Sequence, residues 1–228
     1  VDAGEDATIC ENDTYQTLGW TTNAYGIMWT TAGDGSFDDP TSTVAVYTPG
    51  TQDLINGSVV LTLTANSIPP CTAQVSDDVV VSFQNLPTAD AGADAEICGN
   101  ETYTLSGDAT NYASVEWTTS GTGTFDNPNA LNATYTPSQA DINNGGVNLT
   151  LTAYAAAPCA IDATDYMVLD ITPLPVADAG NDKTVCENAT FILEEAVATD
   201  YSSVMWTTSG TGSFTDPTVV NATYNPSA

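Results

Sequence analysis

The string WTTSGTG, residues 117–123, decides the fold because the chain carries it in two identical copies and one near-identical copy. It stands as WTTAGDG at residues 29–35 and again as WTTSGTG at residues 206–212. The first two copies lie 88 residues apart, and one extra residue precedes the third. Solenoid repeats have periods of about 20–50 residues, whereas a small independent β-sandwich takes roughly 100. The spacing therefore predicts a tandem array of small sandwich domains.

Other residues recur in step with these strings. They are the Asp of an Asp-Ala-Gly motif (Asp2, Asp90, Asp178) and two cysteine positions (Cys10, Cys98, Cys186; Cys71, Cys159). We divide the chain accordingly into repeat 1 (residues 1–87), repeat 2 (88–175) and repeat 3 (176–228). Repeat 3 has no counterpart of residues 139–174, so we expect it to be incomplete on its C-terminal side and the chain to be a segment of a longer protein.

Apolar residues alternate with polar ones in each repeat, as half-buried antiparallel strands require. Residues 59–65 (VVLTLTA) and 147–153 (VNLTLTA) carry Leu at every second position of their central part. The strands that begin the Trp strings alternate likewise, so three tryptophans are expected in the cores: Trp29, Trp117 and Trp206. The sequence shows no helical periodicity, and it has room for at most one short helical turn near Asp53 and near Asp141. The pattern predicts an all-β fold of tandem Ig-like β-sandwiches, with about seven short strands per repeat, arranged as an extended array.

Composition excludes several functions. The chain has one Lys or Arg and no His against 29 acidic residues, a formal net charge of -28. Binding to nucleic acid or to an anionic membrane surface requires clustered cations, so neither partner is expected. No stretch is apolar enough for direct membrane insertion. Without His or Arg, general acid–base chemistry has few groups to use, so we expect no catalytic residues and no enzyme.

The cysteines predict disulfides within the repeats. A sandwich of this size buries a modest core, and secreted domains of that size often add a disulfide. We expect pairs Cys10–Cys71 and Cys98–Cys159, with Cys186 left without its partner. Free buried thiols are the alternative. Zinc is not expected, because the chain has no CxxC motif and no His.

Six aspartates at the starts of the repeats are candidates for metal binding: Asp2, Asp6, Asp90, Asp94, Asp178 and Asp182. Carboxylates next to the linkers at Leu86-Pro87 and Leu174-Pro175 are suited to bridging neighbouring domains through Ca²⁺, a cation that prefers oxygen ligands. The alternative is that Asp in Asp-Ala-Gly forms a turn and bonds its own backbone. No cofactor is required on either interpretation.

A series of motifs occurs in one order along the chain: ADAG-x-D, IC, a Tyr/Phe-x-Leu strand, WTTSGTGTF, NATYTPS and V-x-LTLTA. Together they resemble the PKD-like and Ig-like tandem repeats of very large secreted surface proteins of Bacteroidota, including gliding and attachment adhesins. The resemblance implies an exported protein, secreted or held at the cell surface, with an extended, filament-like form. It does not imply what such a protein binds.

The sequence thus predicts a structural stalk or filament segment that spaces an adhesive or motile end from the cell. Its expected partners are other repeats of the same protein, including self-association into filaments, with surface glycans or other cells bound through regions outside this chain. A second interpretation is a carbohydrate-binding or accessory module of a secreted enzyme, which should expose two or three aromatic residues in a row. A third is a self-polymerising fibre subunit in which strand exchange completes repeat 3.

Overall fold

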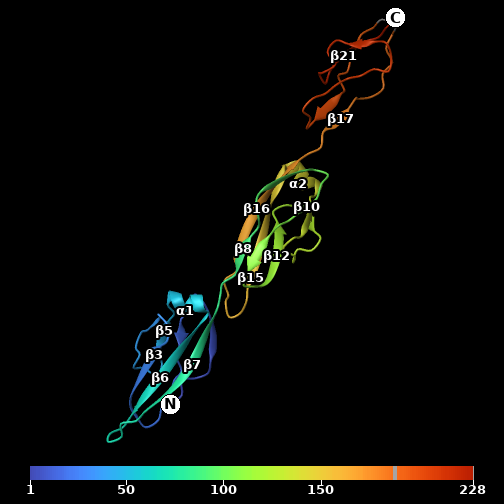
Figure 1. The fold of residues 1–228 in the computed structure, drawn as a ribbon. Helices are drawn as coiled ribbons and strands as arrows, with labels where there is room; N and C mark the ends of the chain where they lie inside the picture. Colours follow the sequence, from blue (N-terminus) through green and yellow to red (C-terminus); the bar gives the residue numbers. More distant parts are fainter. Residues whose placement is uncertain (187–188, 228) are drawn as a thin grey trace.

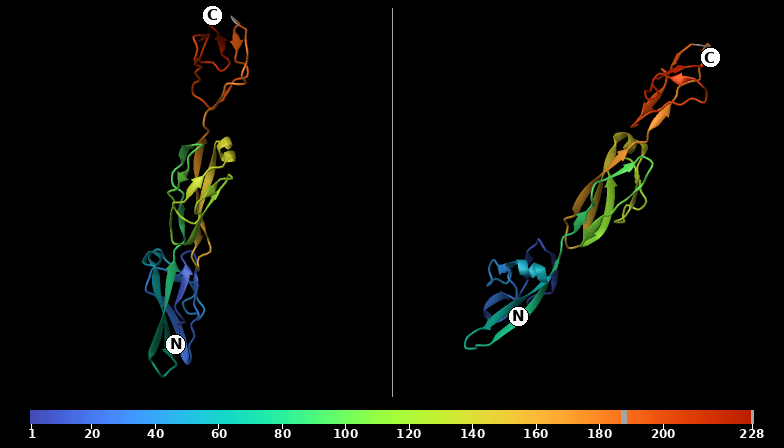
Figure 2. Two further views of the ribbon diagram at one scale, coloured as in Figure 1. Left: turned by 90° about the vertical axis from the view of Figure 1, so that its right-hand side faces the viewer. Right: turned by 45° about the horizontal axis from the view of Figure 1, so that its top comes forward.

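The computed structural model describes residues 1–186 and 189–227. Three β-rich bodies follow one another end to end, joined by short linkers, and the two chain termini lie in the first and last bodies (Figures 1 and 2). Every sheet lies within one of the three repeats. The fold is all-β apart from two short helices, as the alternating pattern predicted.

Repeat 1 is a sandwich of a four-stranded and a three-stranded sheet. The larger sheet has the order β1 (Ala7–Cys10), β7 (Gln74–Gln84), β6 (Ser58–Ser67), β3 (Ala24–Thr31). The smaller has the order β2 (Tyr15–Gln16), β5 (Val46–Thr48), β4 (Ser36–Phe37). Strand β1 runs parallel to β7, while β6 is antiparallel to both of its neighbours. The strands β6 and β7 form a long hairpin whose tip points away from repeat 2 (Figure 1).

Repeat 2 repeats this plan. Its larger sheet has the order β12 (Tyr112–Thr119), β15 (Gly146–Ala155), β16 (Ala163–Thr172), β9 (Ala95–Cys98). Its smaller sheet has the order β10 (Tyr103–Thr104), β14 (Thr134–Thr136), β13 (Thr124–Phe125), and β8 (Thr88–Asp90) pairs with β11 (Asp108–Thr110). Again the first strand of the large sheet, β9, is parallel to the last, β16. In this repeat the tip of the β15–β16 hairpin, residues 156–162, points toward repeat 1 (Figure 1).

Repeat 3 has only short strand pairs. They are β17 (Val176–Asp178) with β19 (Val197–Thr199), and β18 (Phe191–Ile192), β21 (Thr223–Asn225), β20 (Ser213–Phe214) in that order. The segment around Trp206 is not a strand, because the sequence ends before the region that corresponds to the β15–β16 hairpin against which β12 pairs in repeat 2.

Two separate hydrophobic cores form, one in repeat 1 and one in repeat 2. Trp29 and Trp117 are each only 2% exposed, and Leu61, Leu63, Leu149 and Leu151 are fully buried, so the inward positions of the alternating strands make the cores. Trp206 is half-buried. In all three repeats this tryptophan stacks on a phenylalanine, which in turn contacts a tyrosine of the next strand.

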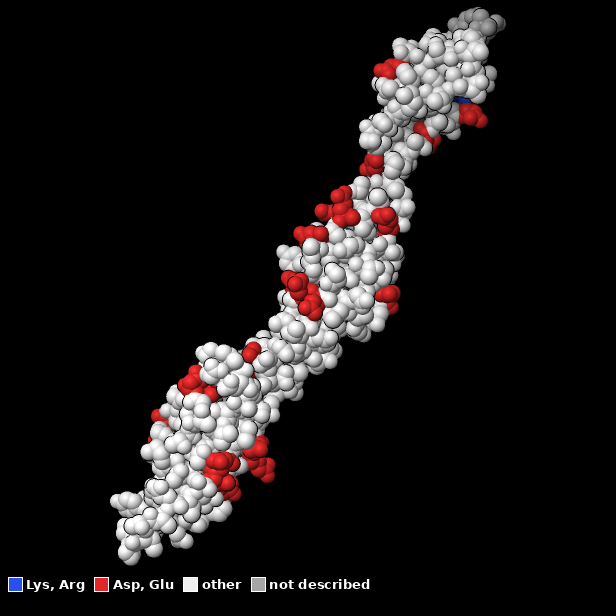
Figure 3. Space-filling model, in the orientation of Figure 1, with Lys and Arg blue, Asp and Glu red and all other residues white. Residues whose placement is uncertain are grey.

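The helices are α1 (Thr51–Asn56) and α2 (Gln139–Asn144), and both lie at the end of their repeat that faces the following linker (Figure 1). Each ends at a glycine in the left-handed conformation, Gly57 at φ 76° and Gly145 at φ 80°, where other residues are strained. Neither is long or apolar enough to cross a membrane, and no other helix occurs among the described residues. Acidic side chains are scattered over all three repeats in the face shown in Figure 3.

Candidate functional site: the covalent joint between repeats 1 and 2

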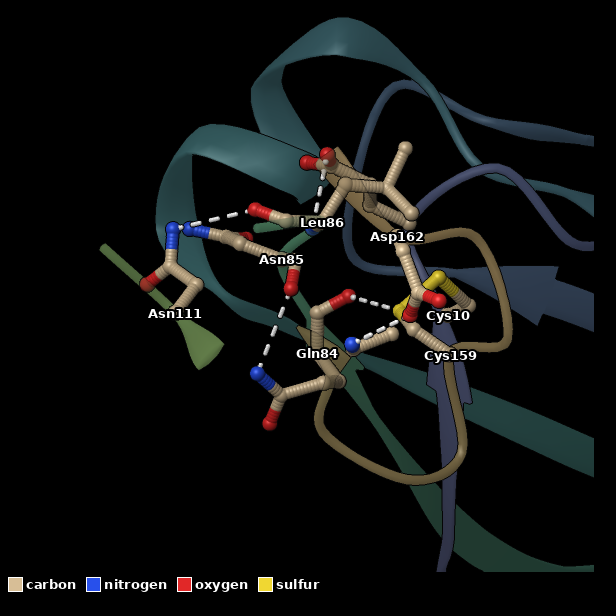
Figure 4. The surroundings of a disulfide bond; sticks show 9 residues. Cys10, Gln84, Asn85, Leu86, Asn111, Cys159 and Asp162 are labelled. Carbon is tan, nitrogen blue, oxygen red and sulfur yellow. Dashed lines mark hydrogen bonds between the residues drawn. A yellow bond between two sulfur atoms is a disulfide. The ribbon is translucent and has the colours of Figure 1, made fainter. Parts of the chain in front are cut away.

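A disulfide joins Cys10 of repeat 1 to Cys159 of repeat 2, with their Cα atoms 4.8 Å apart. Cys10 is the last residue of β1, and Cys159 lies in the tip of the β15–β16 hairpin. Both are buried, with 2% and 6% of their surface exposed. We call this bond the staple, because it fastens the tip of one repeat to the end of another (Figure 4).

The staple corrects the pairing within repeats that the sequence suggested. Cys10 lies beside Gln84, at the C-terminal end of β7, whereas Cys71 precedes the N-terminal end of β7 at Gln74. Because a strand rises about 3.3 Å per residue, these two ends are roughly 30 Å apart, far beyond the 7 Å limit for a disulfide. Cys98 and Cys159 are separated along β16 in the same way, since Cys98 pairs with Thr172.

The parallel pairing of the first and last strands explains why the cysteines meet across repeats. It places the first cysteine of each repeat at the end facing the next repeat, and it places the hairpin tip at the opposite end. The two cysteines that meet are therefore 149 residues apart in sequence, one repeat more than the spacing of Cys10 and Cys71. The remaining three cysteines, Cys71, Cys98 and Cys186, are exposed and unpaired in the described part of the chain.

The linker beside the staple is held from both repeats. The Leu86 amide donates to Glu11 Oε1 of repeat 1 at 3.0 Å, and the Leu86 carbonyl accepts from Asn111 Nδ2 of repeat 2 at 3.2 Å (Figure 4). The Gln84 carbonyl lies 3.2 Å from Cys159 Sγ and also accepts from the Glu11 amide at 3.0 Å. The polypeptide that leaves repeat 1 is thus fixed on the same surface that receives the hairpin tip.

Asn111 reaches the linker through an unusual backbone conformation, with φ at 55°. Asn and Asp tolerate this left-handed region better than other side chains. The same conformation occurs at Asn23 and Asp200, the corresponding residues of repeats 1 and 3. This position was not predicted from the sequence, although an Asn or Asp recurring in register is a signal that indicates it.

Five of the six aspartates proposed for calcium accept hydrogen bonds from backbone amides. Asp2, Asp90 and Asp178 each accept from the amide two residues later, at 2.8 to 2.9 Å. Asp6 and Asp94 accept from the amides of Val80 and Val168, on the neighbouring sheet strand. Within residues 1–186 and 189–227, the Asp182 carboxylate makes no hydrogen bond, and no three acidic, His or Cys side chains gather as a metal site requires. The first three have the geometry of turn-forming residues, and calcium binding stays a prediction.

Trp20, which has no counterpart in the other repeats, makes a local contact. It forms an isolated bridge with Asp2, and its Nε1 donates to Asp2 Oδ2 at 3.1 Å. More than half of its surface is exposed, at 56%.

A second feature that was not predicted from the sequence is a buried carboxylate in the first turn of each helix. Asp53 is 1% exposed and accepts from the Tyr47 hydroxyl at 2.6 Å and from the Gly35 and Gly50 amides. Burial pushes the pKa of Asp53 upward, but the hydrogen bonds from Tyr47 and the amides outweigh it and hold the pKa below its usual range. Burial, followed by the bond to Asp53, raises the pKa of Tyr47 to about 12.

Repeat 2 carries the same network around Asp141. Its carboxylate is fully buried and accepts from the Tyr135 hydroxyl at 2.9 Å and from the Ser138 and Thr122 amides. Here too burial pushes the pKa of Asp141 upward, while the amides and the tyrosine hold it low. These networks fasten each helix to the Gly-rich turn that follows the Trp strand, and so shape the end of the repeat that meets the next linker.

No protein-family model matches the sequence, and no curated protein sequence matches it. Among solved structures, Drosophila N-cadherin EC1-4 is 15% identical, with a TM-score of 0.47 over 74% of this chain and 47% of that one. Mouse cadherin-23 EC22-24 is 16% identical, with a TM-score of 0.43 over 75% of this chain and 63% of that one. A protocadherin gammaB7 EC3-6 cis-dimer structure is 13% identical, with a TM-score of 0.46 over 97% and 63%. The chain spans less than two thirds of each of these solved chains, and its fold assignment rests on the sheets and cores described above.

Proposed function

We propose that this chain is a non-catalytic segment of an extracellular stalk, which holds an adhesive or motile end away from a cell. The observation that carries the proposal is the staple. A disulfide between neighbouring repeats adds nothing to a binding pocket or a reaction, but it fixes one repeat on the next. Fixed joints between repeats are what an array needs to remain extended.

The linker supports the same function. Only three residues, Asn85 to Pro87, separate β7 of repeat 1 from β8 of repeat 2. Pro87 is buried and Leu86 is bonded from both sides, so the junction has little freedom to bend.

The chemistry of the bond favours an extracellular location. Structural disulfides form and persist in oxidising compartments, such as the cell exterior or the bacterial periplasm. The resemblance of the repeats to those of secreted Bacteroidota surface proteins agrees with such a location. It also suggests that longer proteins of this kind contain many such repeats.

A carbohydrate-binding module is a weaker interpretation. Exposed aromatic residues do occur on the outer face of the large sheet of repeat 2, where Tyr154 and Tyr166 are 37% and 60% exposed. They do not form a row, because Tyr166 pairs with Thr150, four residues along β15 from Tyr154, a separation of about 13 Å along the strand. Tyr154 is also engaged by Glu116 through a 2.6 Å hydrogen bond.

Small-angle X-ray scattering of the oxidised chain tests the proposal. A compact protein of 228 residues has a radius of gyration of about 17 Å. We expect a much larger radius and the scattering profile of a rod, at the mass of a single 23.6 kDa chain. A radius near 17 Å contradicts the stalk. A mass that grows with concentration favours the strand-exchanging fibre subunit instead.

A further inference from the structure

The staple changes which residues bear load when the chain is pulled from its ends. It closes a loop between Cys10 and Cys159, which are 149 residues apart in sequence and 4.8 Å apart in space. Nearly all of repeat 1 and most of repeat 2 lie inside that loop, including both buried tryptophans. Tension follows the shortest covalent path, which crosses from Cys10 directly to Cys159.

We propose that the staple is a mechanical bypass, which carries tension past the folded cores of repeats 1 and 2 so that neither core unfolds under load. This proposal deepens the stalk function and rests on it. Without the bond, the same cores would be in series with the load, and each would be a weak point in the stalk.

The strand order shows what bears load in the reduced chain. Tension enters repeat 1 at the N-terminal side of β1 and leaves from the C-terminal end of β7. These strands are parallel neighbours, paired from Ala7↔Val81 to Cys10↔Gln84. Their few hydrogen bonds are therefore sheared, and repeat 1 unfolds when they break. Repeat 2 is loaded in the same way through β9 and β16, paired from Leu169↔Ala95 to Thr172↔Cys98.

The oxidised chain spares both sets of hydrogen bonds. Tension runs along the backbone of β1 to Cys10, crosses the staple, and continues from Cys159 through the hairpin tip into β16. Both strands are then held at their two ends by covalent bonds. The other strands of each large sheet are attached to this path only from the side, so they carry no end-to-end load. They are β7, β6 and β3 in repeat 1 and β9, β15 and β12 in repeat 2.

The position of the bond distinguishes a bypass from an ordinary stabilising disulfide. A bond within repeat 1 would leave its linker, and all of repeat 2, in series with the load. The observed bond instead joins the last residue of the strand that receives the load in repeat 1 to the turn before the strand that passes it on in repeat 2. Both cysteines are buried beside Gln84, the last residue of β7, and this burial shields the bond from reductants.

A force-clamp experiment on the full chain, tethered at its two ends, tests the bypass. A Cys71→Ser, Cys98→Ser, Cys186→Ser variant keeps only the stapled pair and excludes other bonds. Repeat 3 lies outside the loop, so its extension serves as an internal reference. With the staple intact, we expect no unfolding step beyond the extension of repeat 3. After a dithiol reductant is added at constant force, we expect two separate unfolding steps that together lengthen the chain by about 500 Å.

Two outcomes overturn the proposal. A single jump of the whole length at the moment of reduction would show that both repeats had already unfolded inside the loop. Two unfolding steps before any reductant is added would show that the staple does not bear the load. The matched control, which adds Cys159→Ser to the same variant, should show the two steps without reductant. A compact shape in X-ray scattering would refute the stalk function but would not change the number or timing of the unfolding steps under force. The stalk function and the mechanical bypass can therefore be refuted independently.

Discussion

The two junctions between repeats follow one sequence plan but differ in what covers them. At the first, Cys10 and Pro87 are buried, whereas at the second their counterparts Cys98 and Pro175 are exposed. The first junction receives the tip of the β15–β16 hairpin, and the described residues of repeat 3 include no such hairpin. The difference teaches that a firm joint is made by the hairpin of the following repeat, not by the linker alone.

The linkers themselves show the consequence. Leu86 is half-buried and bonded from both sides, while Leu174 is 48% exposed. A cavity of about 260 Å³ lies beside the second linker, between Ile142 of α2 and Asp200 of repeat 3. Asp200 takes the place of Asn111 and has no side-chain N–H to donate to the linker.

Removing the staple should reduce the difference between the two junctions more than any other change. We expect Cys159→Ser to make the first junction resemble the second and to lower the free energy of unfolding, summed over repeats 1 and 2, by about 5 kcal/mol in the chain-entropy model. Chemical denaturation and scattering of the oxidised variant measure both effects. Cys71→Ser is the control, since Cys71 is exposed and unpaired, and it should change neither quantity. Equal effects of the two substitutions contradict the account.

The reverse change should convert the second junction into the first. Appending a copy of residues 140–174 after Ala228 supplies repeat 3 with its missing hairpin, including a counterpart of Cys159. We expect Cys98 to bond to that added cysteine and to lose its reactivity toward a thiol-labelling reagent. A matched extension with Ser in place of the added cysteine should leave Cys98 reactive. If Cys98 reacts equally in both, the hairpin does not specify the joint.

The buried carboxylates of repeats 1 and 2 should contribute equally to the stability of their own repeats. Asp53→Asn and Asp141→Asn each remove the charge of a carboxylate that accepts hydrogen bonds from a tyrosine hydroxyl and at least two backbone amides. Each substitution should therefore lower the free energy of unfolding of its own repeat by about 3 kcal/mol. Asp34→Asn, at an exposed carboxylate next to the same turn, is the control and should cost less. Urea unfolding of each variant gives the values. A large difference between the two buried sites would show that the repeats are not equivalent.

These networks also set the pH range of stability. The pKa values of Asp53 and Asp141 are lower in the folded state, so their contribution is present above about pH 4 and is lost as the pH falls further. The pKa of Tyr47 is raised to about 12, so its contribution is present below about pH 10 and is lost as the pH rises toward 12. Stability measured against pH should therefore be flat between these limits and fall on both sides. The acid fall should be shallower in Asp53→Asn.

The smallest effect should come from the linker contact. Asn111→Asp gives the first junction the residue found at the second and removes one hydrogen bond to Leu86, a loss of about 1 kcal/mol. The left-handed backbone is retained, because Asp tolerates it. Asn23→Asp, at the same conformation in repeat 1, is the control for any backbone effect. Thermal unfolding compares the two, and an equal shift for both would assign no role to the contact.

Much of the fold was predictable, because alternation is a local signal. The inward Leu positions of residues 59–65 and 147–153 and the Trp strands set the two faces of the large sheet, and the recurrence of WTTSGTG set the period. The pairing of cysteines was not predictable from that signal. It depends on β1 lying parallel to β7, a contact between residues more than seventy positions apart that leaves no mark on local periodicity.

The buried carboxylates were missed for a related reason. In sequence, Asp53 and Asp141 resemble the many exposed acidic residues of the chain. Only the folded structure shows that a tyrosine six residues earlier donates its hydroxyl to each of them. The sequence also cannot separate two uses of aspartate, since a carboxylate that accepts a backbone amide and one that binds a cation can occupy the same motif, so calcium binding at the repeat starts stays a prediction.

Disulfide mapping of the oxidised chain tests the central claim most directly. Because the chain has a single Lys or Arg, a protease that cuts at acidic residues should be used without reduction, followed by mass spectrometry. The account predicts one linked pair of peptides, containing Cys10 and Cys159. Peptides that link Cys10 to Cys71 and Cys98 to Cys159 would contradict it, because each repeat would then be closed on itself and nothing would join repeat 1 to repeat 2 covalently except the linker.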